Sequence, residues 1–403
     1  MTSSPVPPFP GSHQLASTFG GVTTAHDAGR PPRRSGAARV IVAVLGVIVL
    51  GTICAGVQWG ANVGYDEALI AFDDAVDDTA SSQADLVDAL ATLTATTDAA
   101  AVVIDADSGA LMDPAAKESL AAAIADAEEA ESEGSTSAEE SLPQSGEKPY
   151  WAWELFGEIA ELNADRDDVG QMLDEYETAG DRAVETADAV QETGTAAVLS
   201  AADAAGGFEA AHISARNLDI LALRDAAERV SAASALDETA ADAYVYLESS
   251  AAAMLTSEKA EIAEKQGPLH DARLEVEAFA RDLAPGVLLD FDWSPLVNGY
   301  GEADSMGGYA TWWYSDPGYA TIELSNSVAE YWPGERSRAL VAHEVGHAIS
   351  VKCEGMYDDS SQENIEAWAT AWAISMGFTD TANGTSAYGP PPQSLIDAAA
   401  GCR

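Results

Sequence analysis

The stretch ERSRALVAHEVGHAIS, residues 335–350, decides how the last third of this chain folds. Apolar residues surround His343, Glu344 and His347 in a pattern that predicts a buried helix opened by Pro333-Gly334. Residues four apart share a helix face, so both imidazoles can bind one Zn²⁺ ion, while Glu344 can reach a water there without being a ligand. Unpaired His and Glu side chains would be costly in such a helix. The stretch therefore predicts two metal ligands and a general base.

A third metal ligand is expected from the next apolar helix, ENIEAWATAWA at 363–373. It offers two carboxylates, Glu363 and Glu366. Glu366 follows His347 by 19 positions, which leaves room for one loop and a returning helix. Glu363 can also be a solvated first-turn residue, favoured there by the helix dipole. From the residues alone both carboxylates remain candidates.

These two motifs resemble those of the gluzincin zinc metallopeptidases, and are similar to those of the small ImmA/IrrE-type peptidases. The second gluzincin signature is a Glu followed at +3 by Ala and at +4 usually by Asp or Asn. Glu366 with Ala369 matches it, whereas Thr370 stands at +4 and is a weaker partner for the first His. The resemblance implies a Zn²⁺ site of His343, His347 and Glu366, with Glu344 as the catalytic base of peptide hydrolysis.

The resemblance covers about residues 268–403 and implies an α+β, zincin-like domain with a small antiparallel or mixed sheet and active-site helices. By this analogy the strand at 319–325 would hold an extended substrate by strand addition. The transition-state donor would be a tyrosine, with Tyr357, Tyr388 and Tyr331 as candidates. The tryptophans of this region are expected in the core: Trp312, Trp313, Trp368 and Trp372.

The rest of this domain follows from local signals. A helix is expected near 269–283, then a strand near 287–293. The segment 307–325 has two β-rich runs around the turn sequence at 315–318 and predicts an antiparallel hairpin. Cys353 and Cys402 are expected to form a disulfide, with two free thiols as the alternative.

The net charge of −48 is concentrated in the middle of the chain, where residues 61–265 carry 46 acidic against 9 basic residues. This excludes a general nucleic-acid binder, because phosphate contact needs clustered Lys and Arg. Apolar residues at helical spacing predict a helical, coiled-coil-like region over 61–131 and 150–265, separated by a linker at 132–149. The region could be a spacer, bind an unknown protein partner or self-associate.

A membrane anchor is predicted near the N-terminus. Residues 40–57 are uncharged and apolar, long enough to cross a bilayer, and follow the basic cluster RPPRR. We therefore expect a disordered cytoplasmic tail at 1–37, one transmembrane helix at 38–60 that includes Cys54, and an extracellular remainder. Trp59 and Tyr65 suit the outer interface. A cleaved signal peptide is the alternative.

The sequence thus predicts a membrane-anchored, extracytoplasmic zinc peptidase whose domain spans 266–403 and whose substrate is a peptide or protein at the cell surface. One alternative is a surface interaction or stalk protein with a catalytically degenerate zincin domain. Another is hydrolysis of a cell-wall amide at the same site.

Overall fold

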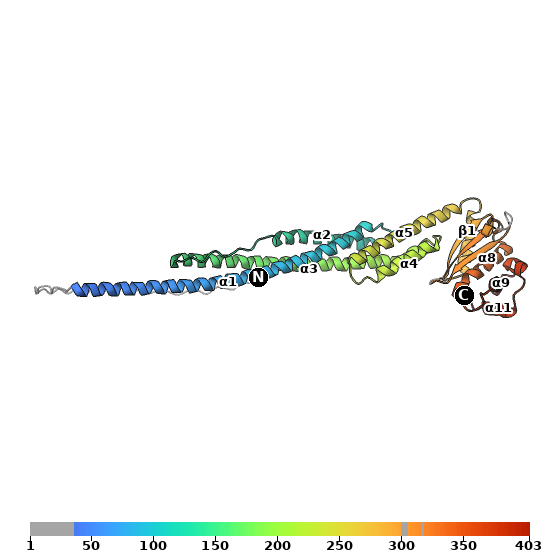
Figure 1. Cartoon of the computed structure of the whole chain (residues 1–403). Coiled ribbons are helices and arrows are strands. Elements are labelled where there is room, and N and C mark those ends of the chain that lie inside the picture. The colour runs from blue at the N-terminus through green and yellow to red at the C-terminus, as the bar shows by residue number, and fades with distance from the viewer. Residues whose placement is uncertain (1–35, 300–304, 316–317) are drawn as a thin grey trace, which may run out of the picture. The chain divides into compact units, whose positions relative to one another are not determined.

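The computed structural model describes residues 36–299, 305–315 and 318–403, coloured by position in Figure 1. The described chain is mostly helical, with one sheet of three strands near its C-terminal end. The predicted tail, residues 1–37, lies outside the described residues except for its last two, which begin the first helix. The longer helices are α1 (Gly36–Ala106), α2 (Pro114–Ala138), α3 (Ala152–Ala211), α4 (Asn217–Ser231), α5 (Glu238–Glu264), α6 (His270–Leu283), α8 (Glu335–Ala348) and α9 (Gln362–Ser375).

The chain divides into two compact units, one of residues 1–69 with 146–161, the other of residues 70–145 with 162–403. In the described part of the first unit, the apolar residues of α1 from Ala43 to Val57 are exposed, and the helix is long and apolar enough to cross a membrane. The side chain of Gln58 in α1 holds the start of α3 through the backbone of Tyr150 and Ala152. Tyr65, expected at the interface, is instead buried.

In the second unit, α2 to α5 pack with the later part of α1 around an Ala-rich core. Asp113 caps α2 by accepting from the N–H of Ala115, and Pro114 occupies the first helical position. The expected linker at 132–149 is helical through Ala138. Gly134 in this helical part is buried against Leu90, where a Cβ atom would come within 2.9 Å of that side chain, so α2 packs closely there despite its polar sequence.

The sheet consists of β1 (Leu288–Ser294), β2 (Gly308–Trp313) and β3 (Tyr319–Ser325). The predicted hairpin is confirmed, because β2 pairs antiparallel with β3; residues 316 and 317 of its turn lie outside the described part. β1 pairs with the other edge of β3 in parallel, which gives the order β1-β3-β2. Helix α8 packs against β2 and β3 on one side and against α9 on the other.

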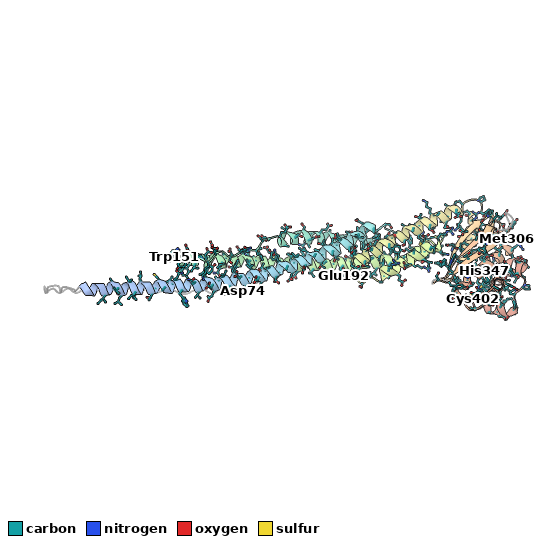
Figure 2. All side chains as sticks on the ribbon, viewed as in Figure 1. Asp74, Trp151, Glu192, Met306, His347 and Cys402 are labelled. Atoms are coloured by element: carbon teal, nitrogen blue, oxygen red, sulfur yellow. A yellow bond between two sulfur atoms is a disulfide. The ribbon has the colours of Figure 1, made fainter. Side chains whose placement is uncertain are left out.

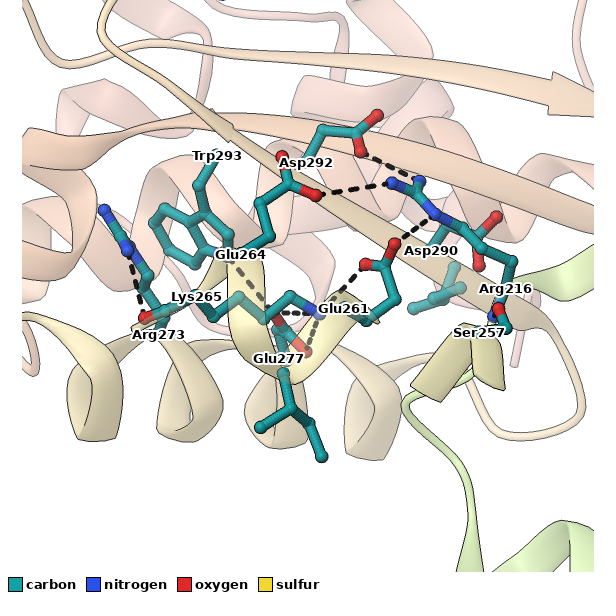
Figure 3. Close-up of polar contacts among 12 residues, drawn as sticks. Arg216, Ser257, Glu261, Glu264, Lys265, Arg273, Glu277, Asp290, Asp292 and Trp293 are labelled. Carbon is teal, nitrogen blue, oxygen red and sulfur yellow. Dashed lines mark hydrogen bonds and ion pairs between the residues drawn. The ribbon is translucent and has the colours of Figure 1, made fainter. Parts of the chain in front are cut away.

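A cluster of charges, buried at Lys265 and Glu277 and partly exposed at Arg216 and Asp292, joins the helical bundle to this sheet (Figure 3). The ammonium of Lys265, at the end of α5, lies 3.2 Å from Glu277 of α6 and 3.3 Å from Glu261. Arg216, just before α4, pairs with Glu261 and, at 2.8 Å, with Asp292 of β1. Since Lys265 and Glu277 are almost fully buried, each charge depends on its partners, and the cluster fixes α5 against α6 and β1.

The predicted disulfide between Cys353 and Cys402 is present. Cys353 follows the short 3₁₀ turn η2 (Ile349–Lys352) at the end of α8. The carbonyl of Cys402 accepts from the indole N–H of Trp372 in α9. The last residues are thereby fixed beside the two helices that carry the metal-ligand motifs. Cys54 is exposed on α1.

Candidate metal centre

Helices α8 and α9 bring together the three predicted ligands. His343 and His347 are one turn apart on α8, and Glu366 faces them from α9. The Oε2 atom of Glu366 lies 3.1 Å from Nε2 of His343 and 3.3 Å from Nε2 of His347. All three side chains are buried, and their ligand atoms lie within 4.8 Å of one another, so the group can hold a metal ion. Figure 2 labels His347 in this region.

The approach of α8 to α9 depends on Gly346. A Cβ atom at this position would meet the carbonyl oxygen of Ala369 at 2.7 Å and its Cα at 2.9 Å. Only glycine therefore lets the two backbones lie this close, which carries Glu366, one turn before Ala369, to the imidazoles. Ser361 caps α9 by accepting from the N–H of Asn364, so that helix begins at a fixed residue.

A backbone carbonyl orients His343. Nδ1 of His343 lies 3.0 Å from the carbonyl oxygen of Asn383, in the short turn η3 (Thr381–Asn383). An N–H at Nδ1 leaves Nε2 with a free lone pair on the side of Glu366, which is the tautomer that a metal ligand needs. Thr370 lies farther from Nδ1, at 3.4 Å. The carbonyl group of Asn383, and not the hydroxyl of Thr370, is thus the nearer partner of Nδ1.

Glu366 is held by the groups around it. Its Oε1 accepts from Nε2 of Gln362 at 2.6 Å, while Oε2 faces the imidazoles. Burial alone would raise the pKa of Glu366, but its interactions with the imidazoles of His343 and His347 outweigh it and hold the pKa well below its usual range. Glu366 is therefore a carboxylate at neutral pH. Glu363, the other candidate ligand, is exposed and lies outside this cluster.

Glu344 is buried beside the cluster, under strand β2. A Cβ atom at Gly308, the first residue of β2, would come within 2.5 Å of Cγ of Glu344, so this glycine leaves the room that the carboxyl group occupies. Burial raises the pKa of Glu344. A carboxyl group with a raised pKa is a better proton acceptor than an exposed one, as a general base requires.

The strand expected to hold a substrate is not the one available for pairing. Tyr319–Ser325 is β3, the central strand, and both of its edges are already paired. The expectation failed because the sequence predicts a hairpin but not the parallel addition of β1 on the far side. The edge strand at the candidate site is β2, where Trp312 stacks on His347 with ring centroids 5.5 Å apart. Trp368 and Trp372 are in the core as predicted, whereas Trp312 is half-buried and Trp313 is exposed.

Tyr388 is the one of the three candidate tyrosines that contacts the cluster. It ends the short helix α10 (Thr385–Tyr388), and its ring stacks on His343 at 5.9 Å between centroids. Burial, together with the charges of Glu366 and Glu344, raises its pKa to about 12, so its hydroxyl remains a donor at neutral pH. Tyr357 stacks on Trp368, and Tyr331 is exposed.

Sequence reasoning missed three contributors: Asn383, which acts through its backbone, Gly308 and Gly346. The dipeptides Gly307-Gly308 and Asn383-Gly384 are visible signals of unusual backbone, but nothing in them points to a particular side chain. Comparisons of this chain with protein families, with curated proteins and with solved structures found no match.

Proposed function

We propose that this protein is a zinc-dependent peptidase of zincin-like fold that cleaves peptide bonds outside the cell while anchored in the membrane by α1. One observation carries the proposal. A single carboxylate oxygen of Glu366 faces Nε2 of both His343 and His347 in a buried site, with the carboxyl group of Glu344 beside them.

The donor set fits zinc. Two imidazole nitrogens and one carboxylate are a ligand set of catalytic zinc sites that leave one position open. The hydrogen bond from His343 to Asn383 fixes the tautomer that such a ligand needs. A zinc ion bound there supplies a Lewis acid, which polarises a carbonyl group and lowers the pKa of water.

The protein's own groups account for the remaining steps. Glu344 takes a proton from the attacking water as oxygen adds to the scissile carbonyl carbon, and delivers it to the leaving amine as the C–N bond breaks. The hydroxyl of Tyr388 donates to the negative charge that develops on the carbonyl oxygen. The outer edge of β2, which pairs with no described strand, binds the extended backbone of the substrate, and Trp312 limits access beside His347.

The membrane anchor rests on composition. The apolar side chains of α1 from Ala43 to Val57 are exposed in the structure, and a lipid environment would cover them. The basic residues before this segment favour a cytoplasmic N-terminus, which places the candidate site outside the cell. This orientation agrees with the disulfide, since such bonds persist in oxidising compartments.

The test compares metal content and cleavage of a peptide library by the wild type and three variants. Glu344→Gln should retain zinc and lose about 10²-fold or more in cleavage rate, since it removes the general base. His343→Ala should lose the metal. Glu335→Gln, an exposed carboxylate on the same helix, is the matched control and should change neither measurement. Equal cleavage by wild type and Glu344→Gln would overturn the proposed mechanism.

A further inference from the structure

Five aromatic side chains are exposed near the point where the apolar run of α1 ends. Their exposed fractions range from 49% to 79%: Trp59, Tyr150, Trp151, Trp153 and Phe156. Among the described residues between 36 and 265, the only other exposed aromatic side chain is Tyr246, at 38%. Figure 2 labels Trp151 in this group. Exposed aromatic side chains are therefore concentrated where the apolar run of α1 ends and α3 begins.

Specific polar contacts hold the start of α3 against α1. Nε2 of Gln58 donates to the carbonyl oxygen of Tyr150 at 3.0 Å, and its Oε1 accepts from the N–H of Ala152 at 2.9 Å. The ammonium of Lys148 pairs with the carboxylate of Asp66, 2.5 Å away. Both contacts lie within the first compact unit. The start of α3 is thus bound to α1 at the first residue after the apolar run.

The length of the apolar run places these aromatic residues relative to a bilayer. Residues 40–57 extend about 27 Å as a helix, close to the roughly 30 Å thickness of a hydrocarbon layer. If the run spans that layer, Gln58 lies at its outer edge, and so does the segment that Gln58 holds. Trp and Tyr favour this interface, because an apolar ring meets the lipid while an N–H or O–H group reaches water.

We propose that residues 150–156 and Trp59 form a second membrane contact, in which their aromatic rings enter the headgroup region of the bilayer that α1 spans. This inference rests on the proposed membrane anchor. The acidic neighbours Glu154 and Glu158 favour a zwitterionic over an anionic lipid surface. Two points of attachment, one from α1 and one from the start of α3, limit the tilt of α1 in the bilayer.

The test uses the full chain in phosphatidylcholine nanodiscs with a polarity-sensitive fluorophore on one cysteine. Cys353 and Cys402 are joined, so a single free thiol can be labelled at a time. The native Cys54 reports on the span. Trp153→Cys and Phe156→Cys, each in a Cys54→Ser background, report on the aromatic contact. Glu161→Cys, exposed on the same helix about 12 Å beyond residue 153, is the matched control.

Lipids with a nitroxide at the headgroup should quench the label at 153 at least about twofold more than the label at 161, and the label at 156 to an intermediate or greater extent, because 153 and 156 lie about 12 Å and about 7.5 Å from 161 along the helix. Lipids with a nitroxide in the acyl chain should quench the label at Cys54. If Cys54 is quenched but 153 and 156 behave like 161, the span stands and the aromatic contact is wrong. If Cys54 is not quenched, the span fails and the inference with it. Labels at 153 and 156 that are shielded from aqueous iodide but not quenched by lipid would show a protein partner, and would also overturn the proposal.

Discussion

Replacing Gly346 with alanine should weaken metal binding while leaving the protein folded. The added methyl would lie 2.7 Å from the carbonyl oxygen of Ala369, whereas ordinary contacts begin at 3.4 Å. Relief of this contact requires α8 and α9 to separate locally by about 0.7 Å, the difference between the two distances. Glu366 lies on α9 and moves with it.

The effect on stability and the effect on metal affinity can be estimated separately. Overpacking costs about 1–3 kcal/mol, while alanine gains about 1 kcal/mol over glycine within a helix, so the free energy of unfolding should fall by about 0–2 kcal/mol. Metal sites tolerate changes of only about 0.2 Å in ligand distance. Loss of support for ligands costs about 10- to 100-fold in metal affinity, and we expect a loss in this range.

Competition with a chromophoric chelator measures the metal affinity, and urea unfolding measures the stability. Gly206→Ala in α3 is the matched control, because no atom lies within 4 Å of the new methyl. It should stabilise the protein by up to about 1 kcal/mol and leave the metal affinity unchanged. Wild-type metal affinity in the Gly346→Ala protein would refute the argument that this close approach positions Glu366.

Three further predictions concern other parts of the second unit. Burial raises the pKa of Asp290 in β1 to about 6. The folded state therefore holds the carboxyl proton of Asp290 more tightly than the unfolded chain does, and the free energy of unfolding falls as pH rises from about 4 to about 6. Asp290→Asn should remove this slope and stabilise the protein at pH 7.5 by about 2–3 kcal/mol, which urea unfolding at pH 4.5 and 7.5 would check. A methyl at Gly384 would collide with the ring of His343, so Gly384→Ala should lower metal affinity by about tenfold or more. Gly377→Ala is the control, because Gly377 also has a positive φ but no atom within 4 Å of the added methyl, and it should change only stability. Tyr388→Phe should retain the metal and lose about 10²-fold in the rate of peptide cleavage, and an unchanged rate would remove the hydroxyl from the proposed mechanism.

Several parts of the candidate site could be predicted because they depend on spacing within one helix. His343 and His347 share a face for any α-helix through residues 335–348. The signature that indicates Glu366 as the third ligand, a Glu followed at +3 by Ala369, also lies within one helix. The disulfide could be predicted because Cys353 and Cys402 are the only pair beyond the apolar run.

Other features could not be predicted because they depend on tertiary contacts. The carbonyl group of Asn383 orients His343, and every residue has such a carbonyl, so no residue type marks it. The room for Glu344 comes from Gly308, which is distant in sequence and meets it only after β2 packs on α8. The same limit explains the error over Tyr319–Ser325, since alternating burial indicates a strand but not whether its second edge is free.

The Cys353–Cys402 disulfide also makes the final packing of the C-terminal residues beside α8 and α9 depend on the redox state of the compartment. Cys353 lies six residues after His347, and the bond closes a covalent loop that contains Glu366. Disulfides of this kind form after export and not in a reducing cytosol. On the proposed function, a newly made chain would lack this bond while it is still inside the cell, and the proteins of the producing cell would be less exposed to hydrolysis. Protein made in a reducing cytosol should accordingly bind zinc more weakly than secreted protein, until an oxidant restores the bond.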